Sequence, residues 1–212
     1  MPAPDSDVPN LDVIDAVVGI APGSRLDLLR AQRPEARLNA QASHAALFAP
    51  ETPGDFTAQE RFALARFIAG LHGPSALADF YAVRLQTSGA SPELAAAIEA
   101  EITAGTTTGP YGHYPAGPLS AEDTSGPAYV VEPEAAGVIG ARLAAGLEHA
   151  HMLVFHPRDS ASPMIQKLLD AGWSTTEIVT LSQLVAFLSF QIRVVHGLRT
   201  LAAQPQTGEA SV

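Results

Sequence analysis

Apolar residues recur at helical spacing along most of the chain. Leu64, Phe67, Ile68 and Leu71 follow one another at i, i+3, i+4 and i+7, which places them on one face of a helix. Similar patterns and stop signals predict helices over residues 10–20, 23–49 with a break at Pro34, 57–72, 74 onward, 92–104, 132–155, 162–171 and 174–197. Alanine and leucine dominate these segments, so we expect a single all-α domain over residues 1–212.

Two helix starts share one capping motif. Thr57 is followed three residues later by Glu60, and Ser174 by Glu177, so each pair forms a capping box in which the side chains satisfy free backbone donors. Each box opens a helix of similar apolar pattern. We interpret this as a weak internal duplication.

The two helices differ in how they continue. Gly73 ends the first, and Pro74 suits the first position of the next, which predicts a helical hairpin. The second runs unbroken to Gly197, so Glu177 and His196 would lie roughly 28 Å apart and share no site. We therefore expect any site to form at the first hinge.

A segment rich in glycine, proline and tyrosine covers residues 105–131. It is long for a connection without regular structure, so it is either functional or mobile. Tyr111 and Tyr114 would line a pocket or wrap a neighbouring subunit, and the composition favours the interface. Residues 204–212 are predicted to be a frayed tail.

Composition excludes several classes of function. The chain has no cysteine, which removes disulfides, thiolate metal sites and cysteine redox chemistry. Its net charge of -10 disfavours binding to nucleic acid or an anionic membrane. The start of the chain lacks the features of a secretory signal, so we expect a cytoplasmic protein. The apolar run 178–195 contains polar interruptions and is interpreted as a core helix, with no membrane span.

Chemistry-bearing residues gather at the predicted hinge. His72, Ser75 and Asp79 are spaced by three and four residues, and Glu60 lies twelve residues before His72. This spacing resembles the signature of the AhpD-like branch of the carboxymuconolactone decarboxylase superfamily, a glutamate followed by Cys-x-x-Cys and a histidine. Residues 168–197 resemble the C-terminal part of peroxidase-related members, and the resemblance covers roughly residues 40–200.

The resemblance implies an all-α, oligomeric fold and, in thiol-bearing members, peroxidase activity. Here His72 and Ser75 occupy the cysteine positions and Asp79 the histidine position. A serine cannot pass through sulfenic acid and disulfide states, so thiol peroxidase chemistry is excluded. We expect a cysteine-less binding or structural partner of itself or of a thiol-bearing paralogue, with no cofactor.

The alternative is a thiol-independent lyase or isomerase acting on a small organic acid or lactone. His72 would be the general base, oriented by Glu60 and Asp79, with Ser75 beside it. The same residues also have structural interpretations. Glu60 completes a capping box, His72 suits a helix end, Ser75 suits a first helical turn, and Asp79 suits a solvated or ion-paired position.

Arg193 lies within the predicted apolar core helix, where an arginine requires a carboxylate partner. Glu60, Asp79 and Glu148 are possible partners. A buried ion pair or an oligomer contact is favoured over a substrate-binding role.

A histidine-rich patch follows in the helix over 132–155. Glu148 and His151 resemble half of a carboxylate-bridged metal site, with His149 and His156 close by in the sequence. The second half is missing, and His149 and His151 point to different sides of a helix. We therefore expect no metal site.

Overall fold

A computed structural model describes residues 12–204 and shows that this part of the chain is all-helical, with no β-strand. The helices are α1 Val13–Val18, α2 Arg25–Ala31, α3 Pro34–Phe48, α4 Ala58–Leu71, α5 Ala76–Thr87, α6 Pro92–Gly105, α7 Pro133–Ile139, α8 Ala141–Phe155, α9 Ser162–Asp170 and α10 Thr175–Ala203, with short 3₁₀ turns η1 Pro118–Glu122 and η2 Pro157–Asp159. The all-α prediction is confirmed.

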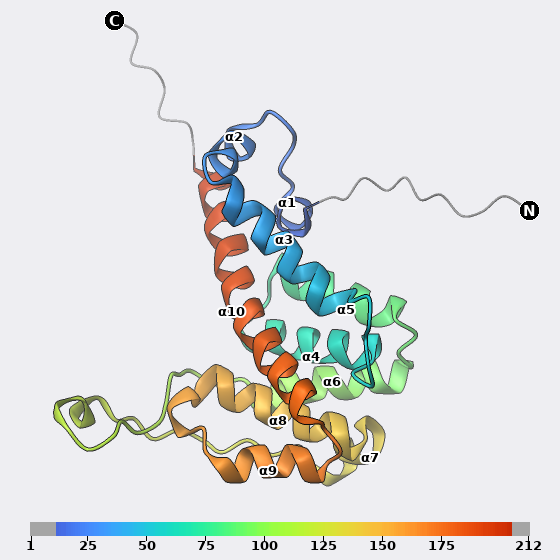
Figure 1. The fold of residues 1–212 in the computed structure, drawn as a ribbon, viewed down its shortest axis with the longest axis vertical. Helices are drawn as coiled ribbons and strands as arrows, with labels where there is room; N and C mark the ends of the chain where they lie inside the picture. The colour runs from blue at the N-terminus through green and yellow to red at the C-terminus, as the bar shows by residue number, and fades with distance from the viewer. Residues whose placement is uncertain (1–11, 205–212) are drawn as a thin grey trace, which may run out of the picture.

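The helices form a body and a stalk (Figure 1). Helices α4 to α9 make up the body, and the first turns of α10 lie against it. The rest of α10 runs away from the body beside α3, and α1 and α2 pack at the end of this stalk. The long α10 therefore connects the two parts.

Helix α4 lies at the centre of the body, and other helices cover it on almost every side. Leu64, Phe67 and Ile68 are fully buried, and α5, α6, α8 and α10 all pack against it. The predicted hairpin of α4 and α5 is confirmed. Burial of these large apolar side chains contributes about 2 kcal/mol each.

Both predicted capping boxes are present. Thr57 Oγ1 accepts from the backbone N–H of Glu60, whose carboxylate accepts from the N–H of Thr57. Ser174 and Glu177 make the same reciprocal bonds at the start of α10. The internal duplication stays a prediction.

Three predicted helix boundaries were wrong. The helix over 132–155 is two helices, because Gly140 has φ +86° and turns the chain between α7 and α8. Helix α10 continues through Gly197 to Ala203. Helix α5 begins at Ala76, two residues after the predicted first position Pro74. Ser75 is its N-cap.

The segment 105–131 projects from the body as an arm (Figure 1). A single bridge between Gly112 and Thr124 pairs its two sides, and η1 forms its tip. Gly126 is required where the arm meets the body, since a Cβ there would lie 2.2 Å from the ring of Tyr111.

Within the described residues, α10 is long and apolar enough to cross a membrane by length and composition, and 44% of its most apolar window is buried. The core helix of a soluble protein satisfies the same criteria. The core-helix interpretation therefore stays a prediction. Of the predicted frayed tail, residues 205–212 lie outside the described part.

Candidate functional site

The hinge between α4 and α5 holds three of the predicted site residues, and two of them end or begin a helix. His72 is the C-cap residue of α4 and keeps part of its surface in contact with solvent, while desolvation of the rest and the charge of Arg193 lower its pKa. The hydroxyl of Ser75 accepts from the backbone N–H of Ala78 at 3.2 Å. Asp79 is exposed in the first turn of α5.

Glu60 does not join them. It lies at the opposite end of α4, twelve residues from His72, which is about 18 Å along a straight helix. The best-formed cavities within residues 12–204 are lined by none of the hinge residues. Glu60 therefore does not orient His72 as the lyase hypothesis required, and the rest of that hypothesis stays a prediction.

Glu60 instead binds Arg142 at the start of α8. The guanidinium donates to Glu60 at 2.9 Å and to Glu177 at 2.7 Å, and it also donates to the carbonyl of Gly172. It lies 4.2 Å from the ring of Trp173. One cation thus joins the two capping boxes and fixes the N-termini of α4, α8 and α10 together.

Arg193 forms no buried ion pair, which was one of its two favoured interpretations, and the oligomer contact stays a prediction. Its side chain is exposed and donates to the backbone carbonyl of Ser189, one turn earlier in α10. The apolar run is amphipathic at this position, and Arg193 lies on the solvent side. An exposed arginine needs no carboxylate partner.

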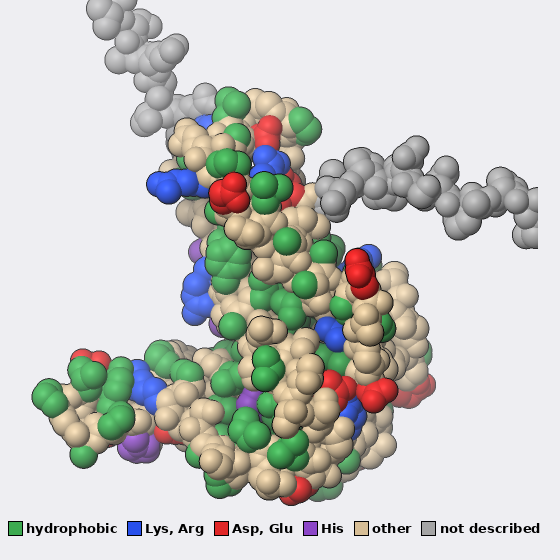
Figure 2. Space-filling model, in the orientation of Figure 1, with side chains coloured by type: hydrophobic (Ala, Val, Ile, Leu, Met, Phe, Trp, Pro, Cys, Tyr) green, Lys and Arg blue, Asp and Glu red, His purple; other side chains and the backbone are tan. Residues whose placement is uncertain are grey.

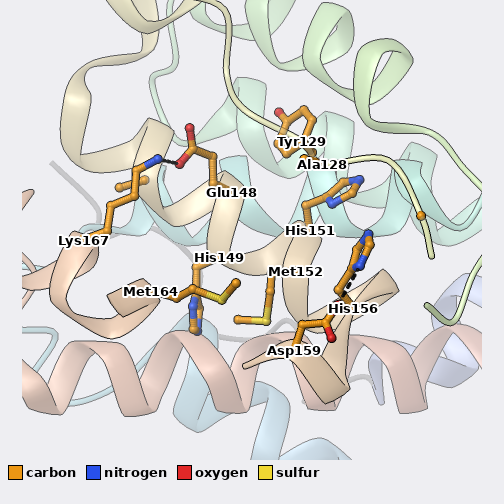
Figure 3. Close-up of a pocket in the computed structure, with 12 residues that line it drawn as sticks. Ala128, Tyr129, Glu148, His149, His151, Met152, His156, Asp159, Met164 and Lys167 are labelled. Carbon is orange, nitrogen blue, oxygen red and sulfur yellow. Dashed lines mark hydrogen bonds and ion pairs between the residues drawn. The ribbon is translucent and has the colours of Figure 1, made fainter. Parts of the chain in front are cut away.

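A second cluster of chemistry-bearing residues surrounds a cavity of about 370 Å³ along α8 (Figure 3). Ala145, Glu148, His149 and Met152 lie at i, i+3, i+4 and i+7 and form one wall. The arm supplies Gly126, Ala128 and Tyr129, η2 supplies Asp159, and α9 supplies Met164 and Lys167; His151 and His156 complete the lining. Three segments distant in sequence thus converge on the histidine-rich patch.

Polar contacts close two sides of the cavity. Lys167 pairs with Glu148, whose other oxygen accepts from the backbone N–H of Val131 at 3.2 Å. On the opposite side His156 lies 3.2 Å from a carboxylate oxygen of Asp159 and 3.1 Å from the carbonyl of Pro127. These contacts hold α9 and the arm against α8.

A hydrogen-bonded aromatic pair forms another wall. The Tyr129 hydroxyl donates to the buried carboxylate of Glu101 at 2.6 Å, and burial raises the pKa of that tyrosine. Its ring stacks on His151 at 4.4 Å between centroids.

Two histidines of the cavity are buried. His149 and His151 are 5% and 3% exposed, and this burial lowers the pKa of both. His149 Nε2 lies 3.2 Å from Ser182 on α10, whereas His151 Nε2 lies 2.9 Å from the carbonyl of Gly105. They point to different sides, and no group of three metal-ligating residues forms within residues 12–204.

The two predicted arm tyrosines lie near this cavity. The Tyr111 ring is 5.0 Å from that of His156, and its backbone N–H donates to the carbonyl of Phe155. Tyr114 packs under Arg158, whose guanidinium lies 4.2 Å from the ring. Whether either tyrosine also contacts a second subunit stays a prediction.

Sequence reasoning missed Arg142, Tyr129 and Lys167. A local signal existed for the α8 wall alone: the polar residues Glu148 and His149 share a helix face with Met152, where a core helix would carry aliphatic residues. Tyr129 and Lys167 reach the cavity from other segments, so no sequence spacing indicates them.

The chain was compared with protein families, curated proteins and solved structures. None of the three comparisons finds a match. The function of the chain is therefore inferred from its sequence and its geometry.

Proposed function

We propose that this protein is a cysteine-less, self-assembling binding protein without the peroxidase chemistry of the AhpD-like proteins that it resembles. The observation that carries the proposal is chemical. The 212-residue chain has no cysteine, and His72 and Ser75 stand where the resemblance places the two thiols. Neither an imidazole nor a hydroxyl can complete a sulfenate and disulfide cycle.

An exposed stripe on α10 supports self-assembly. Its members recur at alternating intervals of three and four residues, which is the spacing of a helix-pairing seam. They are Thr176, Val179, Gln183, Ala186, Phe190 and Arg193. Val179 is 57% and Phe190 46% exposed, so large apolar surface faces water in the single chain.

A groove beside this stripe extends the apolar face. It has a volume of about 710 Å³ and lies between α3 and α10, with Leu47, Phe187 and Phe190 in its lining. None of its lining residues is ionisable. Hydrophobic side chains are visible along the same stalk (Figure 2).

The occupant that fits this face best is a second copy. Each copy carries a net charge of -10, so two copies approach with least repulsion through a surface that has no acidic side chain. In an antiparallel pair of α10 helices, Phe190 would lie opposite Val179 and Ala186 opposite Gln183. Such pairing buries apolar residues on both chains.

Light scattering after gel filtration tests the assembly. We expect the wild type to be a dimer or larger, and Phe190→Glu to weaken the self-association constant at least tenfold, about 1.4 kcal/mol, because it buries a charge in the seam. Val83→Glu is the matched control, since Val83 is 57% exposed on α5, away from the seam. A monomeric wild type that binds a thiol-bearing paralogue through Phe190 would replace the second copy by that partner.

A peroxidase assay tests the missing chemistry. With an organic hydroperoxide and a dithiol reductant, we expect no turnover above the reaction without protein. Turnover that Glu60→Gln abolishes would refute the proposal, because it would place a reaction at the sulfur-free site.

A further inference from the structure

Charge is distributed unevenly between the stalk and the body. The outer part of the stalk, residues 12–48 and 190–203, carries six arginines and four acidic side chains. Residues 49–189, which include the whole body, carry six cationic and fifteen acidic side chains. Each molecule therefore has a net positive stalk end and a strongly negative body, and such an asymmetric field orients an approaching charged partner.

Helix α10 shows the same division along its length. Glu177, its one acidic residue, lies in the first turn and already binds Arg142. Residues 178–192 contain no ionisable side chain. Arg193 and Arg199 follow in the outer half of the helix, and both are exposed. An uncharged central face is therefore followed by cations towards the end of the stalk.

Exposed acidic residues surround the first turns of α10, which we call its base. Asp170 ends α9 four residues before the N-cap of α10, and Glu51 and Asp55 follow the end of α3. The rings of Phe56 and Trp173 lie 5.0 Å apart, so the loop after α3 lies beside the start of α10. Within residues 12–204 no ion pair uses any of these three carboxylates.

The apolar stripe brings the two ends of α10 together. With Phe190 opposite Val179 of a second copy, Arg193 lies three residues further along one helix and therefore faces Thr176 of the other. Thr176 lies in the first turn of α10, six residues after Asp170. A contact argued from apolar side chains thus places a cation of one copy at the acidic base of the other.

The sides of α10 match in the same way. The groove between α9 and α10 is lined on the α10 side by residues that include Thr175, Ser182 and Ala186. Arg193 follows Ala186 by seven residues, or two turns, and so lies on the same side of the helix. The symmetry axis of an antiparallel pair runs across both helices, so equivalent sides of the two copies meet. Arg193 therefore approaches the end of α9 in the second copy, at Asp170.

Helix α3 covers another side of α10 and runs against its direction (Figure 1). The rings of His44 and Phe187 lie 6.4 Å apart where the two helices meet. Arg33, the exposed N-cap residue of α3, is eleven residues before His44 and therefore lies beside the outer end of α10. In the antiparallel pair it faces the loop with Glu51 and Asp55 in the second copy.

We propose that two copies associate antiparallel, with the stalk of each copy on the body of the other, so that Arg193 pairs with Asp170 and Arg33 lies beside Glu51 and Asp55. The inference rests on the self-assembly proposed above and adds the charges that set its direction. A parallel pair would instead bring the two cationic stalk ends together and the two acidic bodies together, and like charges across an interface are costly.

Charge reversal tests this pairing. In a symmetric pair, Arg193→Glu or Asp170→Arg replaces two attractive contacts by two repulsive ones, so we expect each variant alone to associate at least tenfold more weakly than wild type. In an equimolar mixture of the two variants every contact again joins opposite charges, and we expect the mixed dimer to recover about the wild-type association constant. Both residues are exposed, so both variants should fold. Sedimentation equilibrium with one variant fluorescently labelled measures these constants.

Two controls test the direction and the position of the contact. A parallel pair would place Arg193 of one copy beside Arg193 of the other, so Arg193→Glu would bind wild type more tightly than it binds Asp170→Arg. That result would overturn the inference. Glu93→Lys reverses an exposed charge on α6, outside the proposed contact, and should leave association unchanged. If it weakens association as much as Asp170→Arg does, the position of the charge has no role and the inference fails.

Failure of this inference differs from failure of self-assembly. A wild type that stays monomeric would refute self-assembly and this arrangement with it. A wild type that associates through Phe190, with a constant that neither Arg193→Glu nor Asp170→Arg changes, would overturn the charge pairing alone. Raising sodium chloride from about 0.05 to about 0.5 M should weaken the wild-type association, because salt screens exposed charge pairs. Unchanged or stronger association at high salt would overturn the pairing.

Discussion

The hinge between α4 and α5 and the cavity along α8 both contain histidine and carboxylate side chains, but the surroundings of these residues differ. At the hinge His72 is exposed and Ser75 serves as a helix cap, while Glu60 is bound to Arg142 at the far end of α4. At the cavity His149 and His151 are buried, and one ring nitrogen of each is held by a neighbouring element. Sequence spacing indicated a site at the hinge, whereas the polar side chains of distant segments come together at the cavity.

This difference shows what turns a histidine into a possible binding group. A side chain at an exposed helix end competes with water for any ligand, and its hydrogen bonds are worth little. A buried imidazole with one ring nitrogen held by a neighbour has a fixed orientation, and a buried polar nitrogen without a partner costs about 1–3 kcal/mol.

The largest expected effect is on the pH dependence of the free energy of unfolding, which should differ between the buried His44 and the exposed His72. Burial and the charge of Arg84 lower the pKa of His44 to about 4, so the unfolded chain takes up this proton first as pH falls. The stabilisation is complete above pH 6.5 and is lost as pH falls towards 4. We expect about 3 kcal/mol less acid destabilisation between pH 7 and pH 4 in His44→Leu than in wild type.

Denaturant unfolding at the two pH values measures this difference, and the baseline cost of each substitution cancels. His72→Gln is the hinge counterpart and should change the pH-dependent loss less, because His72 is only partly desolvated whereas His44 is 7% exposed. Parallel curves for wild type and His44→Leu would show that burial does not hold His44 neutral.

Replacing Arg142 should weaken the packing of α8, which forms a wall of the cavity, and should leave the hinge between α4 and α5 in place. Arg142→Ala leaves Glu60 and Glu177 without their cation at partly buried positions, and it exposes the face of Trp173. We expect a loss of about 2 kcal/mol in the free energy of unfolding. Urea denaturation measures this loss.

Arg66→Ala is the control for Arg142→Ala, since Arg66 forms one pair with the more exposed Glu99. We expect it to cost less than 1 kcal/mol. Equal losses for the two variants would mean that the shared position of Arg142 between two capping boxes adds nothing.

Features fixed by neighbours in sequence were predictable, and features fixed by distant contacts were not. Both capping boxes, the break at Gly73 and the positive φ of Gly172 follow from local backbone chemistry. The partner of Glu60 lies 82 residues away, so spacing offered no means of choosing Arg142 over Arg193.

The misjudged burial of Arg193 has a related cause. An apolar run of this length fits either a fully buried helix or one with a single solvent-facing stripe, and only packing decides between them. The histidine-rich patch was noticed, but its meaning depended on Tyr129, Met164 and Lys167, which approach α8 from the arm and from α9. Residues that meet only in the folded chain leave no local pattern.

The smallest expected effect tests the hinge itself. Ser75→Ala removes the side-chain acceptor for the N–H of Ala78 and should cost about 1 kcal/mol, the usual value of an N-cap. Ser91→Ala is the matched control, because Ser91 caps α6 through the N–H of Leu94 in the same way. Thermal or urea unfolding of both variants compares the two caps.

If Ser75 acts only as a cap, Ser75→Asp should restore the stability lost in Ser75→Ala, because aspartate accepts the same bond and suits the positive end of a helix. A cost for Ser75→Ala several times that of Ser91→Ala, without recovery in Ser75→Asp, would contradict the capping role. It would return the hinge to consideration as a site, because only a contact specific to the hydroxyl could distinguish serine from aspartate there.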